Sequence, residues 1–161
     1  MFKSTEAFIN NRAPFTTGFQ LKVIPTIKAI KGGNPNQCYF NAQKLKESSE
    51  RKGKKMSITS GWIVNSHDTA NNCTAIIAHW WNIDENNNHI DTSPILGSNK
   101  REYVQDNEIL DFCAKNDDKL TIHQHFSLLY INGKYEVLID QEKFHFRKID
   151  SLKTEFFYNL I

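Results

Sequence analysis

The stretch from Ile76 to Pro94, IIAHWWNIDENNNHIDTSP, constrains the fold of this chain more than any other segment. Residues 76–83 are dense in β-branched and aromatic side chains, and residues 84–88 are polar types that favour turns. Residues 89–91 then begin a second extended run. The pattern therefore predicts two antiparallel strands joined by a polar turn.

The register of this predicted hairpin brings a histidine and a carboxylate together. If the turn centres near Glu85 or Asn86, antiparallel pairing places Asp91 opposite or nearly opposite His79. Directly opposed side chains on one face have Cβ atoms about 4.5–5.5 Å apart, so these two side chains can share a hydrogen bond. The carboxylate would then select one histidine tautomer and stabilise its charged form.

Cys38 is the predicted nucleophile for this pair. The Gly, Asn and Pro residues of 32–37 indicate a loop, and residues 38–53 have a helical pattern with Gly53 as its stop. Cys38 therefore begins a helix, where unpaired N–H groups and the helix dipole lower the pKa of a thiol. The N–H of Cys38 would also face an oxyanion formed on an attacked carbonyl.

Further candidate residues surround this predicted site. Gln37 or Asn36 could add a side-chain donor to the oxyanion hole, and Asn34 is a weaker candidate. Asn41, in the first turn of the helix, is expected to act in local capping or loop support. The substrate cleft is predicted to be lined by three tryptophans, Trp62, Trp80 and Trp81.

Each of these residues also has a simpler interpretation. Most free cysteines are small buried hydrophobic residues, and Cys38 alone could be one of them. Cys73 follows two asparagines in a turn and Cys113 falls on the apolar face of a predicted helix, so both are interpreted as structural. A lone histidine between apolar residues, such as His79, is more often a core residue than a base. Asp91 alone could form an Asx-type turn with the Thr-Ser-Pro that follows it. The catalytic interpretation depends on Cys38, His79 and Asp91 acting together.

Four short motifs resemble the papain-like and transglutaminase-like cysteine proteins. They are C-Y-x-N-A, G-W, A-H-W-W-N and I-D-T-S-P, within residues 34–96, about 40% of the chain. The resemblance implies that Cys38 is the nucleophile, His79 the general base and acid, and Asp91 the residue that orients His79. Two features depart from the pattern: the Cys-to-His segment is short, and Gln37 is adjacent to the cysteine rather than several residues before it.

The order of elements predicts a single α+β domain over residues 1–161. An antiparallel sheet of about five strands is expected to pack against an N-terminal helix that carries Cys38. Gly61 within the strand at 57–65 indicates a bulge or a close approach, and Asn132–Gly133 indicates a type I′ hairpin turn. The remaining predictions are extended segments broken by Pro25 within 19–30, a helix at 103–114 and a hairpin within 120–140.

Composition excludes several classes of protein. The net charge of +2 is too small to argue for nucleic acid or an acidic membrane, and no apolar run is long enough for a membrane span. Three cysteines without a C-x-x-C motif favour reduced thiols and a cytoplasmic setting. The N-terminus lacks the apolar run of a signal peptide, although delivery by a dedicated machine stays open. The oligomeric state is not determined by the sequence.

A metal site is the rival chemistry. His123 and His125 project from one face of a predicted strand, and with His79, His89 or Asp91 they could form a two-histidine, one-carboxylate site. An H-x-H pair on a strand is more commonly surface decoration or packing. The chain has no Gly-rich phosphate loop, H-E-x-x-H motif or dinucleotide fingerprint, so no cofactor is expected.

The sequence therefore favours a cysteine-dependent hydrolase or acyl transferase that acts on an amide or ester carbonyl of a protein or peptide. Peptidase, deamidase and transglutaminase-like outcomes remain open, because the acceptor and the cleft walls decide between them. The main alternative is a non-catalytic binding module on the same fold, and the metal-site protein is the weaker one.

Overall fold

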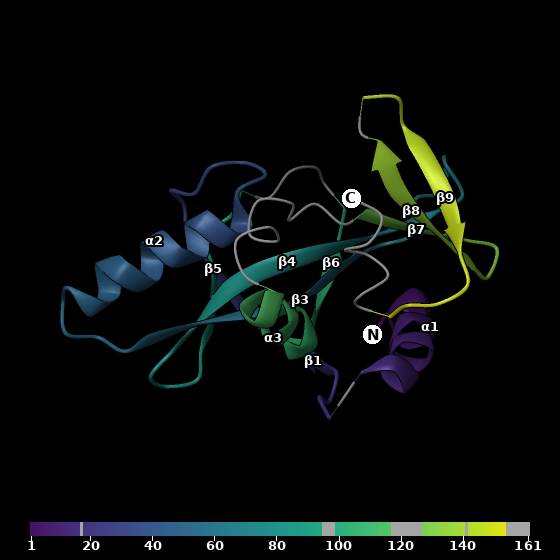
Figure 1. Ribbon diagram of the computed structural model, residues 1–161. Coiled ribbons are helices and arrows are strands. Elements are labelled where there is room, and N and C mark those ends of the chain that lie inside the picture. Colours follow the sequence, from purple (N-terminus) through teal and green to yellow (C-terminus); the bar gives the residue numbers. More distant parts are fainter. Residues whose placement is uncertain (17, 95–98, 117–126, 141, 154–161) are drawn as a thin grey trace.

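The computed structural model describes residues 1–16, 18–94, 99–116, 127–140 and 142–153 (Figure 1). This part of the chain forms an α+β fold with three α-helices and a nine-stranded sheet. The sheet is antiparallel except for one parallel pair. Among the described residues, no helix combines the length and apolar character needed to cross a bilayer.

Along the described part of the chain, the helices separate runs of two, four and three strands. The helices are α1 (Lys3–Arg12), followed by the 3-10 turn η1 (Ala13–Phe15), α2 (Cys38–Glu50) and α3 (Asn107–Asn116). The strands are β1 (Lys22–Ile24), β2 (Ile27–Ala29), β3 (Met56–Asn65), β4 (Thr74–Asp84), β5 (His89–Asp91), β6 (Arg101–Gln105), β7 (Ser127–Ile131), β8 (Lys134–Asp140) and β9 (His145–Ile149).

The central strand β4 has a divided outer edge, and this division positions the site. The main strand order is β1-β6-β3-β4-β7-β8-β9. On the edge of β4 away from β3, the described pairs with β7 cover Thr74–Ile77, whereas β5 pairs with Asn82 and Ile83. Residues 78–81, including His79, therefore lie between the two ladders.

The two faces of the sheet bury different clusters. α2 and α3 lie across the central strands (Figure 1), and one buried cluster on this face includes Phe8, Cys38, Ala42, Trp62, Val64, Ile76, Ala78, Trp80, Val104 and Ile109. The opposite face carries a smaller cluster, made of Ile24, Ile63, Trp81 and Tyr103. Side chains alternate between the faces of a strand, so adjacent tryptophans at 80 and 81 enter different clusters.

Several local predictions are confirmed. β3, β4 and β5 occupy the predicted strands, and α2 begins at Cys38. The hairpin turn between β7 and β8 has φ of 48° at Asn132 and 79° at Gly133, as a type I′ turn requires. β1 and β2 lie on either side of Pro25, in agreement with two short extended pieces.

The predicted helix at 103–114 is partly wrong, because its first residues belong to strand β6. In β6, Val104 packs in the helix-covered cluster and Tyr103 in the opposite cluster, which is the alternation of a strand. The helix starts only after Asp106, whose Oδ1 accepts a 3.2 Å bond from the N–H of Glu108. The sheet also has nine strands where about five were predicted, because strands of three to five residues leave weak periodic signals.

Helix α1 was not predicted, and its buried positions explain why. Two of its three buried residues, Thr5 and Arg12, are polar, and only Phe8 is apolar. Arg12 Nε donates to Asp106 Oδ2 over 2.9 Å, and Trp62 Nε1 donates to the same oxygen over 2.8 Å. A buried ion pair therefore ties α1 to the start of α3, and no apolar stripe marks the helix in the sequence.

Candidate active site

His79 and Asp91 form a direct hydrogen bond, although they are not directly opposed in the sheet. The β4–β5 register pairs Ile83 with His89 and Asn82 with Ile90, which centres the turn on Asn86. Continued by one residue, this register places Asp91 opposite position 81, two residues from His79 on the same face. A diagonal neighbour is within reach of an imidazole, and His79 Nε2 lies 2.7 Å from Asp91 Oδ2.

Asp91 is a buried carboxylate with three donors around it. Besides His79, the Tyr103 hydroxyl donates to Oδ2 over 2.9 Å and the Ser93 N–H donates to Oδ1 over 2.8 Å. Only 4% of Asp91 is exposed. Burial by itself raises the pKa of the carboxyl, but the hydrogen bond and positive charge of His79, with the other two donors, lower it below 3.8.

The imidazole of His79 is held in its charged form. Burial by itself lowers the pKa of this ring, but hydrogen bonds with Asp91 and Cys38 outweigh burial and raise the pKa from 6.5 to about 9. An ionised carboxylate can only accept hydrogen bonds, so Nε2 carries a proton. At neutral pH the site therefore contains an imidazolium paired with a carboxylate.

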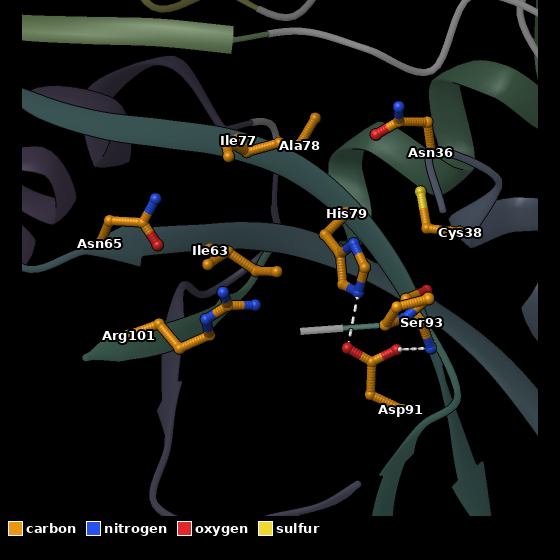
Figure 2. Close-up of a pocket in the computed structure, with 11 residues that line it drawn as sticks. Asn36, Cys38, Ile63, Asn65, Ile77, Ala78, His79, Asp91, Ser93 and Arg101 are labelled. Atoms are coloured by element: carbon orange, nitrogen blue, oxygen red, sulfur yellow. Dashed lines mark hydrogen bonds and ion pairs between the residues drawn. The ribbon is translucent and has the colours of Figure 1, made fainter. Parts of the chain in front are cut away.

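Cys38 lies on the far side of the His79 ring from Asp91. It is the first residue of α2, and its side chain interacts with His79. Asp91 occupies Nε2, which leaves Nδ1 for the sulfur. In Figure 2, Asp91 and Cys38 flank the ring from opposite sides. The structure thus brings together the three residues that the sequence predicted as nucleophile, base and orienting carboxylate.

The loop before Cys38 is tied to the segment after Asp91. Asn41 Oδ1 accepts from the N–H of Asn34 over 2.9 Å, and Asn41 Nδ2 donates to Asn34 O over 2.8 Å and to Ser93 Oγ over 3.4 Å. The N–H of Gly33 donates to Thr92 O over 3.0 Å. A Cβ built at Gly33 would lie 2.2 Å from that oxygen, so only glycine permits this approach. These contacts fix the start of α2 relative to the carboxylate.

The predicted oxyanion donors separate into two groups. Asn36 lines the pocket beside Cys38, and its backbone has φ of 57°. Gln37 is the residue before α2, it is exposed, and its Oε1 accepts a 3.3 Å bond from Asn34 Nδ2. Gln37 is not part of the pocket lining. The N–H of Cys38 belongs to the first turn of α2, whose N–H groups have no acceptor within the helix, so it remains a candidate oxyanion donor. The pocket therefore favours Asn36 over Gln37.

The three tryptophans were predicted to line the substrate cleft, but in the structure they lie outside the pocket lining. Trp62 is 0% exposed, Trp80 and Trp81 are each 1% exposed, and none of the three lines this pocket. Trp62 and Trp80 pack under the helices, because their face of the sheet is the covered one. Trp81 instead stacks on His79 at 6.2 Å between ring centroids and donates from Nε1 to His89 Nδ1 over 2.8 Å.

Gly61 makes room for this stacked arrangement. It lies directly opposite His79 in the β3–β4 ladder. A Cβ on Gly61 would lie 2.7 Å from the Trp81 ring and 2.1 Å from Val104 O. Of the two predicted explanations for this glycine, a close approach is therefore the one that the structure supports.

The site opens into a small pocket of about 150 Å³ (Figure 2). A cavity of about this volume holds a benzene molecule. Cys38, His79 and Asp91 line one end of it, and Asn65 and Arg101 line it as well. Although Cys38 is only 6% exposed, it belongs to this lining and is not sealed within the apolar core.

Sequence reasoning missed Tyr103, because it was expected in a helix. The only available signal was the alternation Arg101, Tyr103, Gln105 within REYVQ, which places these three on one face of a strand. His123 and His125, the two histidines of the rival metal site, lie outside the described residues. Within the described residues, no group of three or more His, Cys, Asp and Glu side chains could hold a metal ion.

Comparisons of the chain with family models, curated proteins and solved structures found no match.

Proposed function

We propose that this protein is a cysteine hydrolase or acyl transferase with a papain-like or transglutaminase-like arrangement of Cys38, His79 and Asp91. The observation that carries the proposal is the 2.7 Å bond between His79 Nε2 and Asp91, with Cys38 on the other side of the ring. A histidine placed between a carboxylate and a thiol is the arrangement that activates a cysteine nucleophile.

The first half of the reaction forms a thioester. The Cys38 thiolate attacks an amide or ester carbonyl, and the carbonyl oxygen takes the negative charge of the tetrahedral intermediate. The N–H of Cys38 and the side chain of Asn36 are the candidate donors to this oxyanion. The intermediate then collapses, and the imidazolium of His79 gives its Nδ1 proton to the departing amine or alcohol.

The second half regenerates the enzyme. Neutral His79 removes a proton from water or an amine, which attacks the thioester carbonyl and releases Cys38. Water gives hydrolysis or deamidation, and an amine gives transfer. Asp91 stays ionised throughout, because its hydrogen bonds from Ser93 and Tyr103 stabilise the charged carboxylate. A protein or peptide is the proposed substrate.

A second candidate function is a non-catalytic binding module that retains this pocket. The observation in its favour is the low exposure of the three residues, 6% for Cys38, 7% for His79 and 4% for Asp91. A buried Cys-His-Asp cluster can also serve as a polar core. The two candidates differ in the reactivity of the sulfur.

The discriminating experiment measures thiol reactivity and acyl transfer on the full chain. At pH 6, iodoacetamide should label Cys38 at least tenfold faster than Cys73, whose pKa is raised by burial and the charge of Asp68. An activated acyl ester should leave an adduct on Cys38 that hydroxylamine removes, detected by intact mass. Cys73→Ser is the matched control and should retain the wild-type labelling rate of Cys38 and its acyl adduct.

His79→Gln should lose both the fast labelling and the acyl adduct while the protein remains folded. A wild-type Cys38 that reacts no faster than Cys73 and forms no adduct would exclude the enzyme and favour the binding module.

A further inference from the structure

The pocket has a second polar end, and the sheet register defines where it lies. On the His79 face of the sheet, Gly61 pairs with His79 in one row and Ile63 pairs with Ile77 in the next. The row after that pairs Asn65 with Arg101. Four residues along a strand span about 13 Å, so an apolar row separates this polar row from the catalytic histidine.

Arg101 brings a positive charge toward the pocket. Its guanidinium extends from β6 toward the His79 end of the pocket in Figure 2. Arg101 also hydrogen-bonds to the Tyr103 hydroxyl, which orients its side chain. A guanidinium has five N–H donors in a planar fork, a geometry that matches a carboxylate.

Asn65 supplies an acceptor beside this charge. Its Oδ1 is buried, lines the same pocket and has no hydrogen-bond partner among the described residues. A buried polar atom without a partner is costly, and a ligand N–H would satisfy it. A carboxylate and an amide N–H close together are the two polar features of a peptide residue that is acidic or C-terminal.

We propose that Arg101 and Asn65 form a subsite that selects peptides carrying a carboxylate on the part of the chain that extends past the apolar row, away from the carbonyl attacked by Cys38. The carboxylate pairs with Arg101, a peptide N–H donates to Asn65 Oδ1, and the intervening carbon atoms cover Ile63 and Ile77. This inference rests on the proposed function for the reaction, but the binding step does not require the thiol.

Charge and size at the pocket agree with this ligand. Arg101 is the positively charged lining residue that pairs with Asn65 in the sheet, whereas the charges of His79 and Asp91 offset each other. The volume of about 150 Å³ is enough for one side chain or a chain end.

The test measures binding to the full-length Cys38→Ala variant, by chemical-shift titration at low salt. Three probes differ in whether and where they carry a carboxylate, and the glutamate and glutamine probes are otherwise matched. N-acetyl-alanyl-glutamate α-amide carries it on the side chain, N-acetyl-alanyl-alanine carries it at the chain end, and N-acetyl-alanyl-glutamine α-amide has none. We expect one of the charged probes to bind about tenfold or more tightly than the neutral one. Which charged probe binds identifies the source of the carboxylate.

Variants of the polar row then assign the selectivity. Arg101→Gln should abolish the preference for the charged probe, and Arg101→Lys should retain part of it because the charge remains. Asn65→Ala should weaken the charged and neutral probes by a similar factor and leave the preference unchanged. The matched control is Lys100→Gln, which removes an exposed positive charge next to Arg101 in sequence.

Equal binding of all three probes, or a preference that survives in a folded Arg101→Gln variant, would overturn the subsite. The proposed function fails in a different way. If wild-type Cys38 proves unreactive while the charged probe still binds through Arg101, the subsite stands and the protein is a carboxylate-peptide binding module.

Discussion

Replacement of Asp91 by Asn tests the central pair most directly, because it keeps the side-chain volume and removes the charge. Asp91 Oδ1 accepts from the Ser93 N–H, and an asparagine oxygen can retain that bond. The new amide nitrogen must then face His79 Nε2 and donate to it. Neutral His79 would consequently carry its own proton on Nδ1, toward Cys38, where it can no longer accept a proton from the thiol.

The size of the effect follows from the His79 pKa. With Asp91 present the pKa is about 9, and without the carboxylate it should fall toward the ordinary 6.5, because burial still lowers it and only the contact with Cys38 still raises it. The change corresponds to roughly 3 kcal/mol, since a tenfold change in an ionisation constant is about 1.4 kcal/mol. At pH 7 the charged fraction of the imidazole would fall from about 99% toward about a quarter.

Two measurements test the expected changes, one in the pKa of His79 and one in the reactivity of Cys38. Long-range ¹H–¹⁵N correlation spectra recorded from pH 5 to pH 10 report the pKa and tautomer of His79. Iodoacetamide labelling at pH 7 reports the Cys38 thiolate, and its rate should fall roughly 10- to 10³-fold, less than the ~10⁴ loss of turnover for the equivalent change in the serine triad. Asp150→Asn is the matched control, since it removes an exposed carboxylate and should change neither measurement.

A His79 pKa that stays near 9 in a folded Asp91→Asn variant would refute the reasoning, because the carboxylate would not be what holds the imidazole charged. A large loss of stability with unchanged labelling would instead mean that Asp91 only holds the turn that follows it.

Three further predictions concern the surroundings of the pair. The pKa of His79 is raised on folding, so the stability contributed by His79 is complete below pH 6.5 and is lost as the pH rises through about 9. The pKa of Asp91 is lowered on folding, so the stability contributed by Asp91 is present above pH 3.8 and is lost as the pH falls through the pKa of the folded state. Urea unfolding at pH 5, 7 and 9.5 should therefore show an alkaline loss in wild type that is reduced in Asp91→Asn, and parallel curves would contradict the assignment. Tyr103→Phe removes a 2.9 Å hydrogen bond to Asp91, so it should lower the free energy of unfolding by about 1 kcal/mol and raise the pKa of Asp91. Urea unfolding measures the first effect and carboxyl NMR titration the second; an unchanged Asp91 pKa would mean that the bond does not form in solution. Asp106→Ala breaks the buried ion pair with Arg12 and should lower the free energy of unfolding in urea by roughly 3–5 kcal/mol. The Cys38 labelling rate of the folded fraction should stay unchanged; a slower rate would show that the Arg12–Asp106 pair is coupled to the His79–Asp91 pair.

The sequence allowed prediction of those parts of the fold that depend on neighbouring residues. A strand needs alternating β-branched and aromatic residues, and a tight hairpin needs residues that accept positive φ. Both signals are local, which is why β3, β4 and the Asn132–Gly133 turn were predictable. Short strands such as β1 and β9 are stabilised mainly by their partners, so their own residues carry little signal.

The candidate site also has one part that was predictable from neighbouring residues and one part that was not. The contact between His79 and Asp91 was predictable because a short turn links them, and a short turn leaves few possible registers. Cys38 is much farther away in sequence, and only its place at the start of a helix indicated a nucleophile. Its approach to His79 depends on how α2 packs at the divided edge of β4, which no local pattern specifies.

The sequence alone determined the hairpin that carries His79 and Asp91 and the helix that begins at Cys38. Only the tertiary structure decided that Tyr103, Arg101 and Asn65 join the site, and that the three tryptophans do not line its pocket. The physical reason is that alternation along a strand shows which side chains share a face, but not which face the helices cover or which distant strand pairs alongside. Those choices come from packing the whole sheet, in which β6 places Tyr103 next to Asp91 and Arg101 next to Asn65.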